Sequence, residues 1–387
     1  MLRVLLHTPT FGEDEIEAAV AVLRSTNVTQ GARVREFEDA FAAMFGFKNA
    51  VACNSGSSAN LLAVASLCAL DRLKPGDEVI VSALSWSTTV WPLIQHGLVP
   101  VFVDCDPNTL NIGPVEVVKA MSERTRAVMP VHVYGNPCDL GALTSLCKAH
   151  GGLLIEDACE AMGAFYDGKA VGSFGHAGTF SFYFSHHITT LEGGMVVTTD
   201  DDLADMMRMQ RSHGWTRDVR NPKWLEGTPG IDPRFMFATT GYNLRLTEDH
   251  AAIGLVQLRK LGIFVSQRLD NYVLYRERLD RYPWLCPQRD TPDSEGSYFG
   301  FPVVLRGAPF ETADLTTQLN VQGIETRPII AGNLALHPPL RRHAHRTVGD
   351  LAVATDILRN GFALPNHQGM GEAEVNYVCD AIDEFVA

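Results

Sequence analysis

An alternation of short apolar runs with longer helical patterns is the feature of this sequence that most constrains its fold. The apolar runs predict strands over residues 50–53, 78–82, 99–103, 127–132 and 152–157. The helical patterns predict helices over residues 57–70, 87–96, 139–150 and 202–212. Apolar strands separated by helices indicate an α/β fold with a mostly parallel sheet covered on both faces. Ligands of such sheets lie beyond the carboxyl ends of the strands.

The remaining segments predict a second, smaller unit. The chain has 387 residues, which exceeds the usual length of one domain. We expect helices over 13–25 and 33–45, a loop or arm over the polar segment 217–240, a long helix over 248–279 and strands near 298–305. These elements divide the chain into a large domain, residues 1–246, and a smaller α+β domain, residues 247–387.

Composition and charge exclude several classes of protein. The formal net charge is −13, and the chain has no basic stripe of the kind that binds nucleic acid. The initial apolar stretch is too short for a signal peptide, and no run approaches the roughly 18 apolar residues of a membrane span. The 8 cysteines include no Cys-x-x-Cys pair, which indicates reduced thiols and a cytoplasmic protein. We therefore expect neither a nucleic-acid nor a membrane partner.

Three segments at predicted strand ends carry residues suited to one ligand. Small residues around Gly56 and Ser57 open a helix and could hold a phosphate, although such residues are often only a helix cap. Asp157 ends a strand, where a carboxylate could pair with a protonated ring nitrogen or cap a helix. His186 follows Ser181 by five residues and could act as a base, or be a core or surface histidine. The order and spacing of the three segments favour one shared site. Adjacent histidine side chains diverge, so we expect no metal site.

The motifs of this chain resemble those of the DegT/DnrJ/EryC1/StrS family of sugar aminotransferases over nearly its whole length. They are Ser55-Gly56-Ser57-Ser58-Ala59-Asn60, Ser85-Trp86-Ser87-Thr88-Thr89, Asp104-Cys105-Asp106, Leu110-Asn111-Ile112, Gly135-Asn136-Pro137, Glu156-Asp157-Ala158-Cys159-Glu160, Glu192-Gly193-Gly194, His213-Gly214-Trp215, Gly241-Tyr242-Asn243-Leu244-Arg245 and Gly323-Ile324-Glu325-Thr326-Arg327-Pro328. The resemblance implies the aspartate aminotransferase-like fold of fold type I enzymes, which use pyridoxal 5'-phosphate (PLP). It also implies a homodimer with shared active sites.

One position departs from the usual pattern of that family. The segment Ser185-His186-His187-Ile188-Thr189-Thr190 is similar to the family's Ser-Lys-Asn-Ile-Thr-Thr, so His186 stands where the lysine that binds PLP covalently is expected. Imidazole has no primary amine and cannot form that bond, but it can move protons near neutral pH. The histidine is typical of the members that remove the 3-hydroxyl of a nucleotide-linked sugar.

The resemblance also implies a role for each site residue. The cofactor would be held without a covalent bond as PLP or its amine form, pyridoxamine 5'-phosphate (PMP). Its phosphate would lie on Gly56, Ser57, Ser181 and, from the neighbouring subunit, Asn243. Trp86 would stack on the ring, Asp157 would pair with the ring nitrogen, and Glu160 would lie near the ring hydroxyl. His186 would be the base. The substrate-binding residues would be His213, Arg217 and Arg327, with Arg217 at the nucleotide phosphates and Arg327 at the carboxylate of an amino donor.

The implied reaction is a dehydration of carbon 3. The substrate would be a 4-keto-6-deoxy hexose, carried on GDP by resemblance to the colitose-pathway members. His186 would take a proton from the cofactor's methylene carbon, the sugar would lose its 3-hydroxyl, and glutamate would recharge the cofactor. The sequence of this chain differs from the usual family sequence at Leu246-Thr247-Glu248-Asp249-His250. The residues that contact the sugar therefore cannot be assigned from the resemblance.

Three alternatives remain open from the sequence. An aminotransferase would need another lysine, for which Lys169 and Lys223 are the candidates in predicted loops. A non-catalytic protein would bind the cofactor or a nucleotide sugar without turnover. An iron–sulfur 3-dehydrase also has a histidine here but needs clustered thiolates. After Cys159 the next cysteine is Cys286, so we expect no iron–sulfur cluster.

Overall fold

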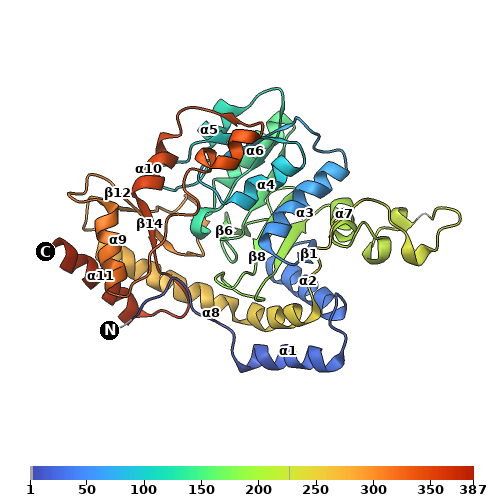
Figure 1. The fold of residues 1–387 in the computed structure, drawn as a ribbon, viewed down its shortest axis with the longest axis horizontal. Helices are drawn as coiled ribbons and strands as arrows, with labels where there is room; N and C mark the ends of the chain where they lie inside the picture. The colour runs from blue at the N-terminus through green and yellow to red at the C-terminus, as the bar shows by residue number, and fades with distance from the viewer. Residues whose placement is uncertain (1–2, 226) are drawn as a thin grey trace.

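The structure, a computed structural model, describes residues 3–225 and 227–387 (Figure 1). Among these residues, eight strands form a central sheet in which β9 runs antiparallel to both neighbours and the other strands run parallel to one another. In sheet order the strands are β1 (Asn49–Cys53), β9 (Gly194–Thr198), β8 (Ala177–Ser181), β5 (Leu153–Asp157), β4 (Thr125–Met129), β2 (Glu78–Ser82), β3 (Val99–Val103) and β13 (Arg346–Thr347). The predicted α/β fold with a mostly parallel sheet is confirmed.

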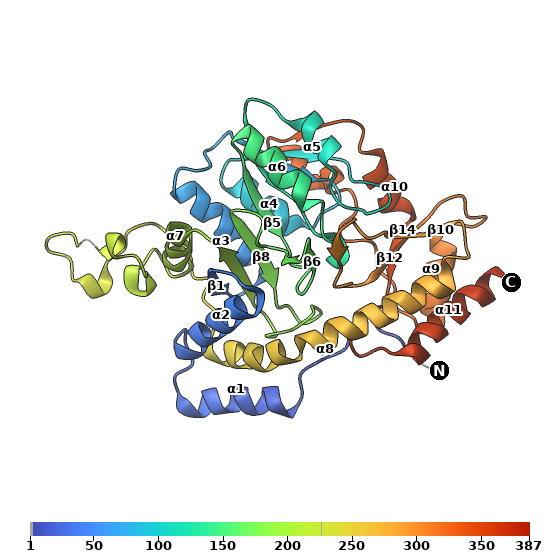
Figure 2. The same cartoon turned by 180° about the vertical axis from the view of Figure 1, so that it is seen from behind.

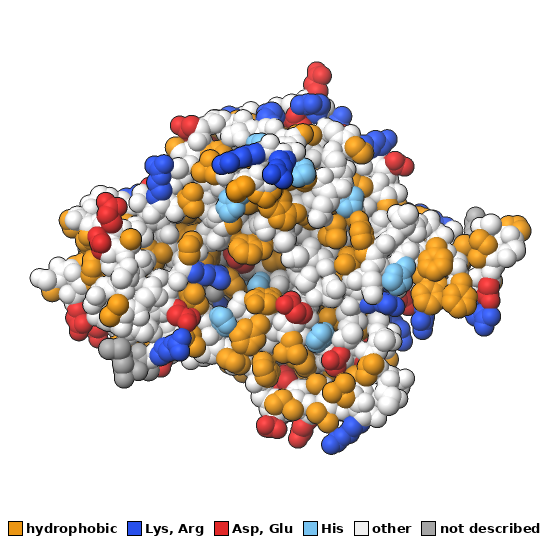
Figure 3. Space-filling model, in the orientation of Figure 1, with side chains coloured by type: hydrophobic (Ala, Val, Ile, Leu, Met, Phe, Trp, Pro, Cys, Tyr) orange, Lys and Arg blue, Asp and Glu red, His pale blue; other side chains and the backbone are white. Residues whose placement is uncertain are grey.

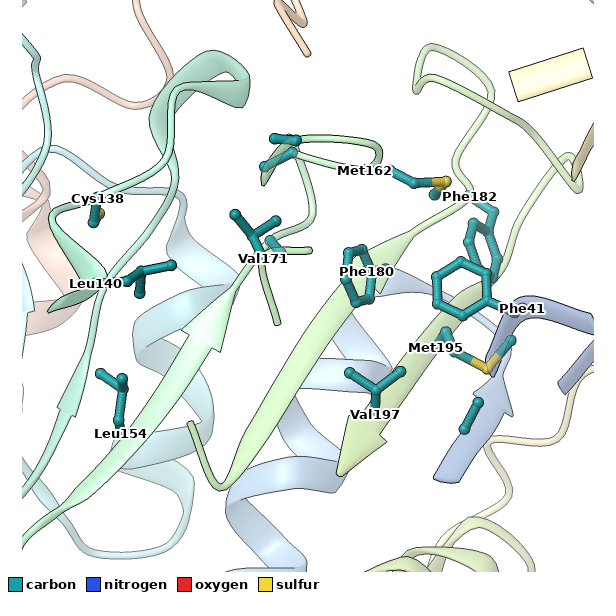
Figure 4. Packing of buried hydrophobic residues seen from close by; sticks show 14 of the residues in the cluster. Phe41, Cys138, Leu140, Leu154, Met162, Val171, Phe180, Phe182, Met195 and Val197 are labelled. Carbon is teal, nitrogen blue, oxygen red and sulfur yellow. The ribbon is translucent and has the colours of Figure 1, made fainter. Parts of the chain in front are cut away.

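Helices cover both faces of this sheet. One face packs against α2 (Ala32–Phe45), α5 (Pro114–Ala120), α6 (Leu140–His150) and α8 (Glu248–Leu279). The other packs against α3 (Gly56–Ala69), α4 (Ser87–Gln95), α7 (Asp201–Arg211) and α10 (Ala352–Asn360). Successive residues of a strand point to opposite faces, so Ile80 belongs to the first core while Val79 and Val81 belong to the second. Figure 4 shows the first core, where Phe41, Phe180, Phe182, Met195 and Val197 point toward one another.

The C-terminal part has its own core around a three-stranded sheet. Its strands are β10 (Leu285–Pro287), β12 (Phe301–Leu305) and β14 (Gly361–Leu364), and its helices are α9 (Thr312–Val321) and α11 (Glu372–Val386). The long helix α8 connects the two parts, with α1 (Glu13–Ser25) beside its first half and α11 beside its second (Figure 2). A third small sheet contains β11 (Ser294–Glu295), β6 (Phe165–Tyr166) and β7 (Lys169–Ala170).

The two parts exchange segments, so the boundary after residue 246 stays a prediction. Val4 packs in the C-terminal core and bridges to Ile324. In return, β13 pairs with β3 and becomes the edge of the large sheet, and the Asp104 carboxylate accepts hydrogen bonds from the amides of Val353 and Ala354 at 2.8 Å.

Several predicted elements differ in extent from those observed. The strand predicted over 127–132 ends at Met129, because Pro130 has no N–H to continue the ladder. The strand predicted from 298 begins at Phe301, since Tyr298 has a left-handed backbone with φ of 48°. Helix α5 and strands β8 and β9 were not predicted.

The segment predicted as an arm projects from the body of the protein (Figure 1), although residue 226 lies outside the described residues. It contains three short 3₁₀ turns, Thr216–Asp218, Pro222–Leu225 and Pro233–Phe235. Among the helices described, none is both long and apolar enough to cross a membrane.

Candidate active site

Four strand ends meet at one edge of the central sheet and carry predicted site residues. Strands β1, β2, β5 and β8 run parallel, so their carboxyl ends lie at the same edge. Gly56 opens the helix after β1, Trp86 precedes the helix after β2, and Asp157 and Ser181 end β5 and β8. The structure therefore brings together these four residues, which are far apart in the sequence.

Gly56 and Ser181 are in close contact. A Cβ atom on Gly56 would lie 2.5 Å from the Ser181 Cβ and 2.8 Å from its Oγ, so only glycine allows this approach. The Ser55 side chain caps α3 by accepting a hydrogen bond from the Ser58 amide at 3.0 Å. The neighbouring Ser57 is exposed. The helix N-terminus and the serines thus form a suitable place for a phosphate.

The Asp157 carboxylate is buried and fully oriented by donors. It accepts hydrogen bonds from Asn60 Nδ2 at 2.8 Å, from Thr89 Oγ1 at 2.7 Å and from the Cys159 amide at 3.2 Å. Asn60 and Thr89 both lie in motifs that the sequence analysis used for the family resemblance. Their contact with Asp157 was missed, because it depends on how α3 and α4 pack over the sheet.

Trp86 is exposed although it is large and apolar. Its side chain is 54% exposed at the strand-end edge, in contrast to the buried residues on either side of the β2–α4 connection. A flat aromatic surface at this place is available to stack on a flat ligand ring.

Glu160 belongs to a cluster with Tyr134 and Arg327. Its carboxylate accepts a hydrogen bond from the Tyr134 amide at 2.9 Å, and Arg327 Nε donates to the Tyr134 hydroxyl at 3.1 Å. Burial raises the pKa of Glu160 to about 7, although the positive charge of Arg327 opposes that rise. The structure thus places Arg327, from the C-terminal part, next to Glu160.

His186 lies in the loop that joins β8 and β9. Its ring centroid is 5.0 Å from that of Phe299 and 6.1 Å from that of Tyr183. Its Nδ1 atom is buried and has no hydrogen-bond partner among the described residues. Burial, together with the positive charges of Arg327 and Arg268, lowers the pKa of His186 to about 3. The imidazole is therefore neutral at physiological pH, which is the form a base must have, although so low a pKa makes it a weak base in these surroundings.

The segment around His186 is held by three buried contacts. The His187 Nε2 atom lies 3.0 Å from the Ser297 carbonyl oxygen and donates to it. The Thr189 amide donates to Gln257 Oε1 on α8 at 3.2 Å, and the Thr189 hydroxyl donates to the Phe182 carbonyl at 3.2 Å. His187 is thus an anchor of the loop, whereas no side-chain hydrogen bond of His186 is found among the described residues.

Phe299 joins the histidines to two arginines. Arg268 is 1% exposed and donates to the carbonyls of Tyr298, Phe299 and Asn366 at 3.3, 2.9 and 2.7 Å. The guanidinium carbons of Arg268 and Arg327 lie 5.9 and 5.1 Å from the Phe299 ring centroid. Phe299 and Arg268 were not predicted as site residues, and the sequence around them contains no local signal that marks either one.

The other predicted site residues lie at the base of the arm. The His213 amide donates to the Tyr242 carbonyl at 2.6 Å, and a bridge joins Ser212 to Asn243. Arg217 is exposed and lies over the Trp215 ring at 5.2 Å. Across the described part of the chain, no hydrogen bond or ion pair links His213, Arg217 or Asn243 to the strand-end residues. One chain therefore does not join the two groups directly.

Lysine is not among the residues that gather at the strand ends. The described residues include every lysine of the chain, and all but Lys260 are exposed. Lys260 is ion-paired with Glu15 at 2.6 Å, Lys223 with Asp202 at 2.5 Å, and Lys169 lies in the small sheet. In the same described ranges, no group of three or more His, Cys, Asp or Glu side chains is arranged to hold a metal ion.

The fold and the strand-end residues define a protein of the PLP-dependent aminotransferase fold. The model of the DegT/DnrJ/EryC1/StrS aminotransferase family matches residues 9–383, and the chain belongs to this family. It is 40% identical over 375 residues to GDP-4-keto-6-deoxy-D-mannose 3-dehydratase of Yersinia pseudotuberculosis, covering 95% of each chain.

Solved structures give the same result. A mutant GDP-4-keto-6-deoxymannose-3-dehydratase with bound GDP-perosamine has a TM-score of 0.94 and 37% identity, covering 98% of this chain and 100% of that one. The same enzyme with a trapped PLP–glutamate geminal diamine has a TM-score of 0.91 and 36% identity, covering 98% and 99% of the two chains. The family and the aminotransferase-like fold predicted from the sequence are confirmed.

Proposed function

We propose that this protein is a PLP-dependent nucleotide-sugar 3-dehydratase that removes the 3-hydroxyl of a GDP-linked 4-keto-6-deoxy hexose, with glutamate as the amino donor. The observation that carries the proposal is His186. It is a neutral imidazole with a buried, unpartnered Nδ1 in the segment where family members have lysine, and the chain's lysines lie elsewhere. The Yersinia relative and the two solved structures described above are named 3-dehydratases, and those structures contain GDP-perosamine or a PLP–glutamate geminal diamine.

The residues at the strand ends fit the cofactor. Gly56, Ser57 and Ser181 would hold its phosphate, and the close approach of Gly56 to Ser181 leaves the helix amides and the serine hydroxyl facing one place. The exposed Trp86 ring would stack on the cofactor ring, and the Asp157 carboxylate would pair with the ring nitrogen. Glu160 would lie near the ring hydroxyl. As PMP, the cofactor supplies an amino group that binds the substrate's ketone and a conjugated ring that accepts electrons.

His186 would move the proton that starts the reaction. Its imidazole is neutral, and its Nδ1 atom has no hydrogen-bond partner among the described residues. The imidazole would therefore be able to take a proton from the carbon that bears the amino group. The same imidazole could then donate this proton to the departing 3-hydroxyl, which leaves as water. Imidazole cannot form the covalent bond to the cofactor that lysine forms. The balanced outcome replaces the 3-hydroxyl by hydrogen and converts glutamate to 2-oxoglutarate and ammonia.

Arginines would bind the anionic parts of the two substrates. Arg327 lies beside Glu160 and Tyr134, where its guanidinium would pair with the carboxylate of glutamate. Arg217 and His213 lie at the base of the arm and would contact the nucleotide phosphates. An acidic chain needs such local positive groups to bind an anionic substrate.

Completion of the site would require a second copy of the chain. His213, Arg217 and Asn243 have no direct link to the strand-end residues, so we propose a homodimer in which Asn243 reaches the cofactor phosphate of the partner. The neighbouring arm, residues 217–240, exposes Phe235 and Phe237 by 59% and 53%. Figure 3 shows hydrophobic side chains gathered on this projecting part of the surface. We also propose a cytoplasmic location, which the free state of all eight cysteines supports.

Mass spectrometry of the reaction product tests the function. The purified protein, PLP, glutamate and GDP-4-keto-6-deoxymannose should yield a sugar with one oxygen fewer, together with 2-oxoglutarate and ammonia. A His186→Asn variant should bind PLP but form no product. An amino sugar as product would overturn the dehydratase and establish an aminotransferase.

Borohydride treatment gives a separate test of the missing covalent bond. The PLP-loaded protein should yield no peptide with a reduced cofactor on lysine, because the lysines lie at the surface or in an ion pair. A single stoichiometrically labelled lysine would contradict the assignment of His186.

Mixing His186→Ala and Asn243→Ala proteins tests the dimer, since subunit exchange should restore one intact site per mixed dimer. Mixtures as inactive as the separate variants would argue against shared sites.

A further inference from the structure

A directed chain of hydrogen bonds leads from the interior of the sheet to the Asp157 carboxylate. The Thr179 hydroxyl donates to Asn60 Oδ1 at 2.7 Å, and Asn60 Nδ2 donates to Asp157 Oδ2 at 2.8 Å. The Thr89 hydroxyl donates to the same Oδ2 atom at 2.7 Å. The four side chains are at most 4% exposed, so water does not compete for these bonds.

The direction of each bond follows from the groups involved. The Asp157 carboxylate can only accept, so the Asn60 atom that faces it must be the NH₂ group. The Asn60 carbonyl then faces Thr179, whose hydroxyl proton it accepts. If the amide were turned over, its oxygen would face the carboxylate oxygen, which would place two acceptors together. The carboxylate therefore determines which way the Asn60 amide faces, and the Thr179 hydroxyl, by donating to the amide oxygen, holds the amide in that position against Asp157.

The two oxygens of Asp157 are used differently. Oδ2 accepts two short hydrogen bonds from side chains, whereas within residues 3–225 and 227–387 the hydrogen bond found at Oδ1 is the longer one, 3.2 Å, from the Cys159 amide. A carboxylate oxygen can accept more than one hydrogen bond, so Oδ1 is the atom with capacity left for a further donor. Both side-chain donors come from helices, Asn60 from α3 and Thr89 from α4, so the carboxylate is held between two rigid elements.

We propose that Asn60, Thr89 and Thr179 are positioning residues that hold Asp157 so that its Oδ1 atom meets the cofactor's ring nitrogen and keeps that nitrogen protonated. The inference rests on the proposed function, because it assumes that Asp157 pairs with the ring. It adds that Asp157 alone is not sufficient. Without the two side-chain donors, the carboxylate can rotate away from the ring plane. The ring nitrogen would then lose its proton at a lower pH, and the ring would accept electrons less readily.

The test replaces Asn60 and follows the ring nitrogen directly. ¹⁵N NMR of the protein loaded with PLP labelled at the ring nitrogen reports protonation as a function of pH, independently of turnover. In Asn60→Leu, the ring nitrogen should lose its proton at a pH at least about one unit lower than in the wild type. The dissociation constant for PLP should rise about tenfold, because a hydrogen bond to a charged group is lost.

Two further variants separate positioning from a general loss of stability. Thr179 is paired with Asp157 across β5 and β8, but its hydroxyl donates to Asn60 and not to the Asp157 carboxylate. Thr179→Val should therefore shift the titration in the same direction by less than Asn60→Leu. It also keeps the inference testable if Asn60→Leu does not fold. Ser66→Ala is the matched control. Ser66 is a buried side chain on the same helix, and its hydroxyl donates to Gln210 at 2.9 Å, remote from Asp157. It should lower the melting temperature without moving the ¹⁵N titration.

The outcomes distinguish this inference from the proposed function. Unchanged ¹⁵N titration in folded Asn60→Leu and Thr179→Val, or an equal shift in Ser66→Ala, would overturn the positioning role. If the wild type binds PLP but does not dehydrate the GDP-sugar, the function fails while a shifted titration still supports the inference. A wild type that does not bind PLP would overturn both.

Discussion

Replacing Gly56 by alanine tests whether the contact between α3 and β8 forms the phosphate end of the site. The added Cβ would lie 2.5 Å from the Ser181 Cβ, whereas carbon atoms pack at about 3.5–4.0 Å. The helix or the strand must therefore move by about 1 Å. Overpacking of this kind costs about 1–3 kcal/mol. Gly262 offers the same substitution without a clash, because nothing lies within 4 Å of its Cβ position in the exposed part of α8.

Gly262→Ala should instead stabilise the protein by about 1 kcal/mol, because alanine favours the helix more than glycine does. Urea unfolding of both variants should therefore differ by about 2–4 kcal/mol in the free energy of unfolding. PLP titration should show weakened binding in Gly56→Ala alone. Removing the opposing Cβ in Gly56→Ala/Ser181→Gly should restore part of the stability but not PLP binding, since the serine hydroxyl is lost. Wild-type stability and PLP affinity in Gly56→Ala would refute the packing argument.

Three other predictions concern the ring, the core and pH. Trp86→Ala should weaken PLP binding about tenfold, measured by titration, and change stability by less than about 0.5 kcal/mol, because the ring is 54% exposed. Glu38→Ala should cost about 3–5 kcal/mol in urea unfolding, because buried Arg211 loses its partner at 2.5 Å, whereas Glu38→Met/Arg211→Met should cost less. Stability should fall as pH drops below 6.5, because burial lowers the pKa of His186 to about 3 and that of His187 well below its usual value. The unfolded chain then binds protons that the folded chain does not, so thermal melts of His187→Gln between pH 8 and 5 should show a smaller loss.

Each of these three predictions would be contradicted by a specific result. Equal PLP affinity in Trp86→Ala would mean that the exposed ring does not contact the cofactor. A double Met variant as unstable as Glu38→Ala would mean that packing, not the unpaired charge, sets the cost. Melting temperatures of the wild type that do not change between pH 8 and 5 would contradict the neutral state of the two histidines.

Much of the sheet could be predicted from the sequence because its strands are apolar on both faces. The runs at 78–82 and 99–103 were predicted with their observed bounds, and so was the long helix over 248–279. Strand β8 escaped prediction because it borders the site and contains Gly178, Thr179 and Ser181 instead of a continuous apolar run. Strand β9 was also missed, although Met195, Val196 and Val197 form a short apolar run between Gly194 and Thr198. The polar residues of β8 are there for contacts that appear only after folding.

Individual residues of the candidate site could be predicted from the sequence, but the contacts between them could not. Gly56, Asp157 and His186 follow strands in recognisable motifs, so their convergence was expected. The donors to Asp157 and the contact of Phe299 with His186 depend on packing between segments that are far apart in the sequence. Asn60 and Thr89 lie 97 and 68 residues from Asp157, and Phe299 lies 113 residues from His186. No local pattern encodes such partners. The roles of individual site residues stay predictions until the variants above are measured.

The pairing of β13 with β3 has a consequence for the order in which the chain can finish folding. Val101 and Phe102 of β3 pair with Arg346 and Thr347. This side of β3 therefore has no pairing strand until nearly the whole polypeptide has been synthesised. During that time the nascent chain presents unpaired backbone groups of β3, which invite wrong pairing with other chains. A fragment ending at residue 246 would keep that edge permanently, and we expect it to associate or precipitate even though most of its core is present.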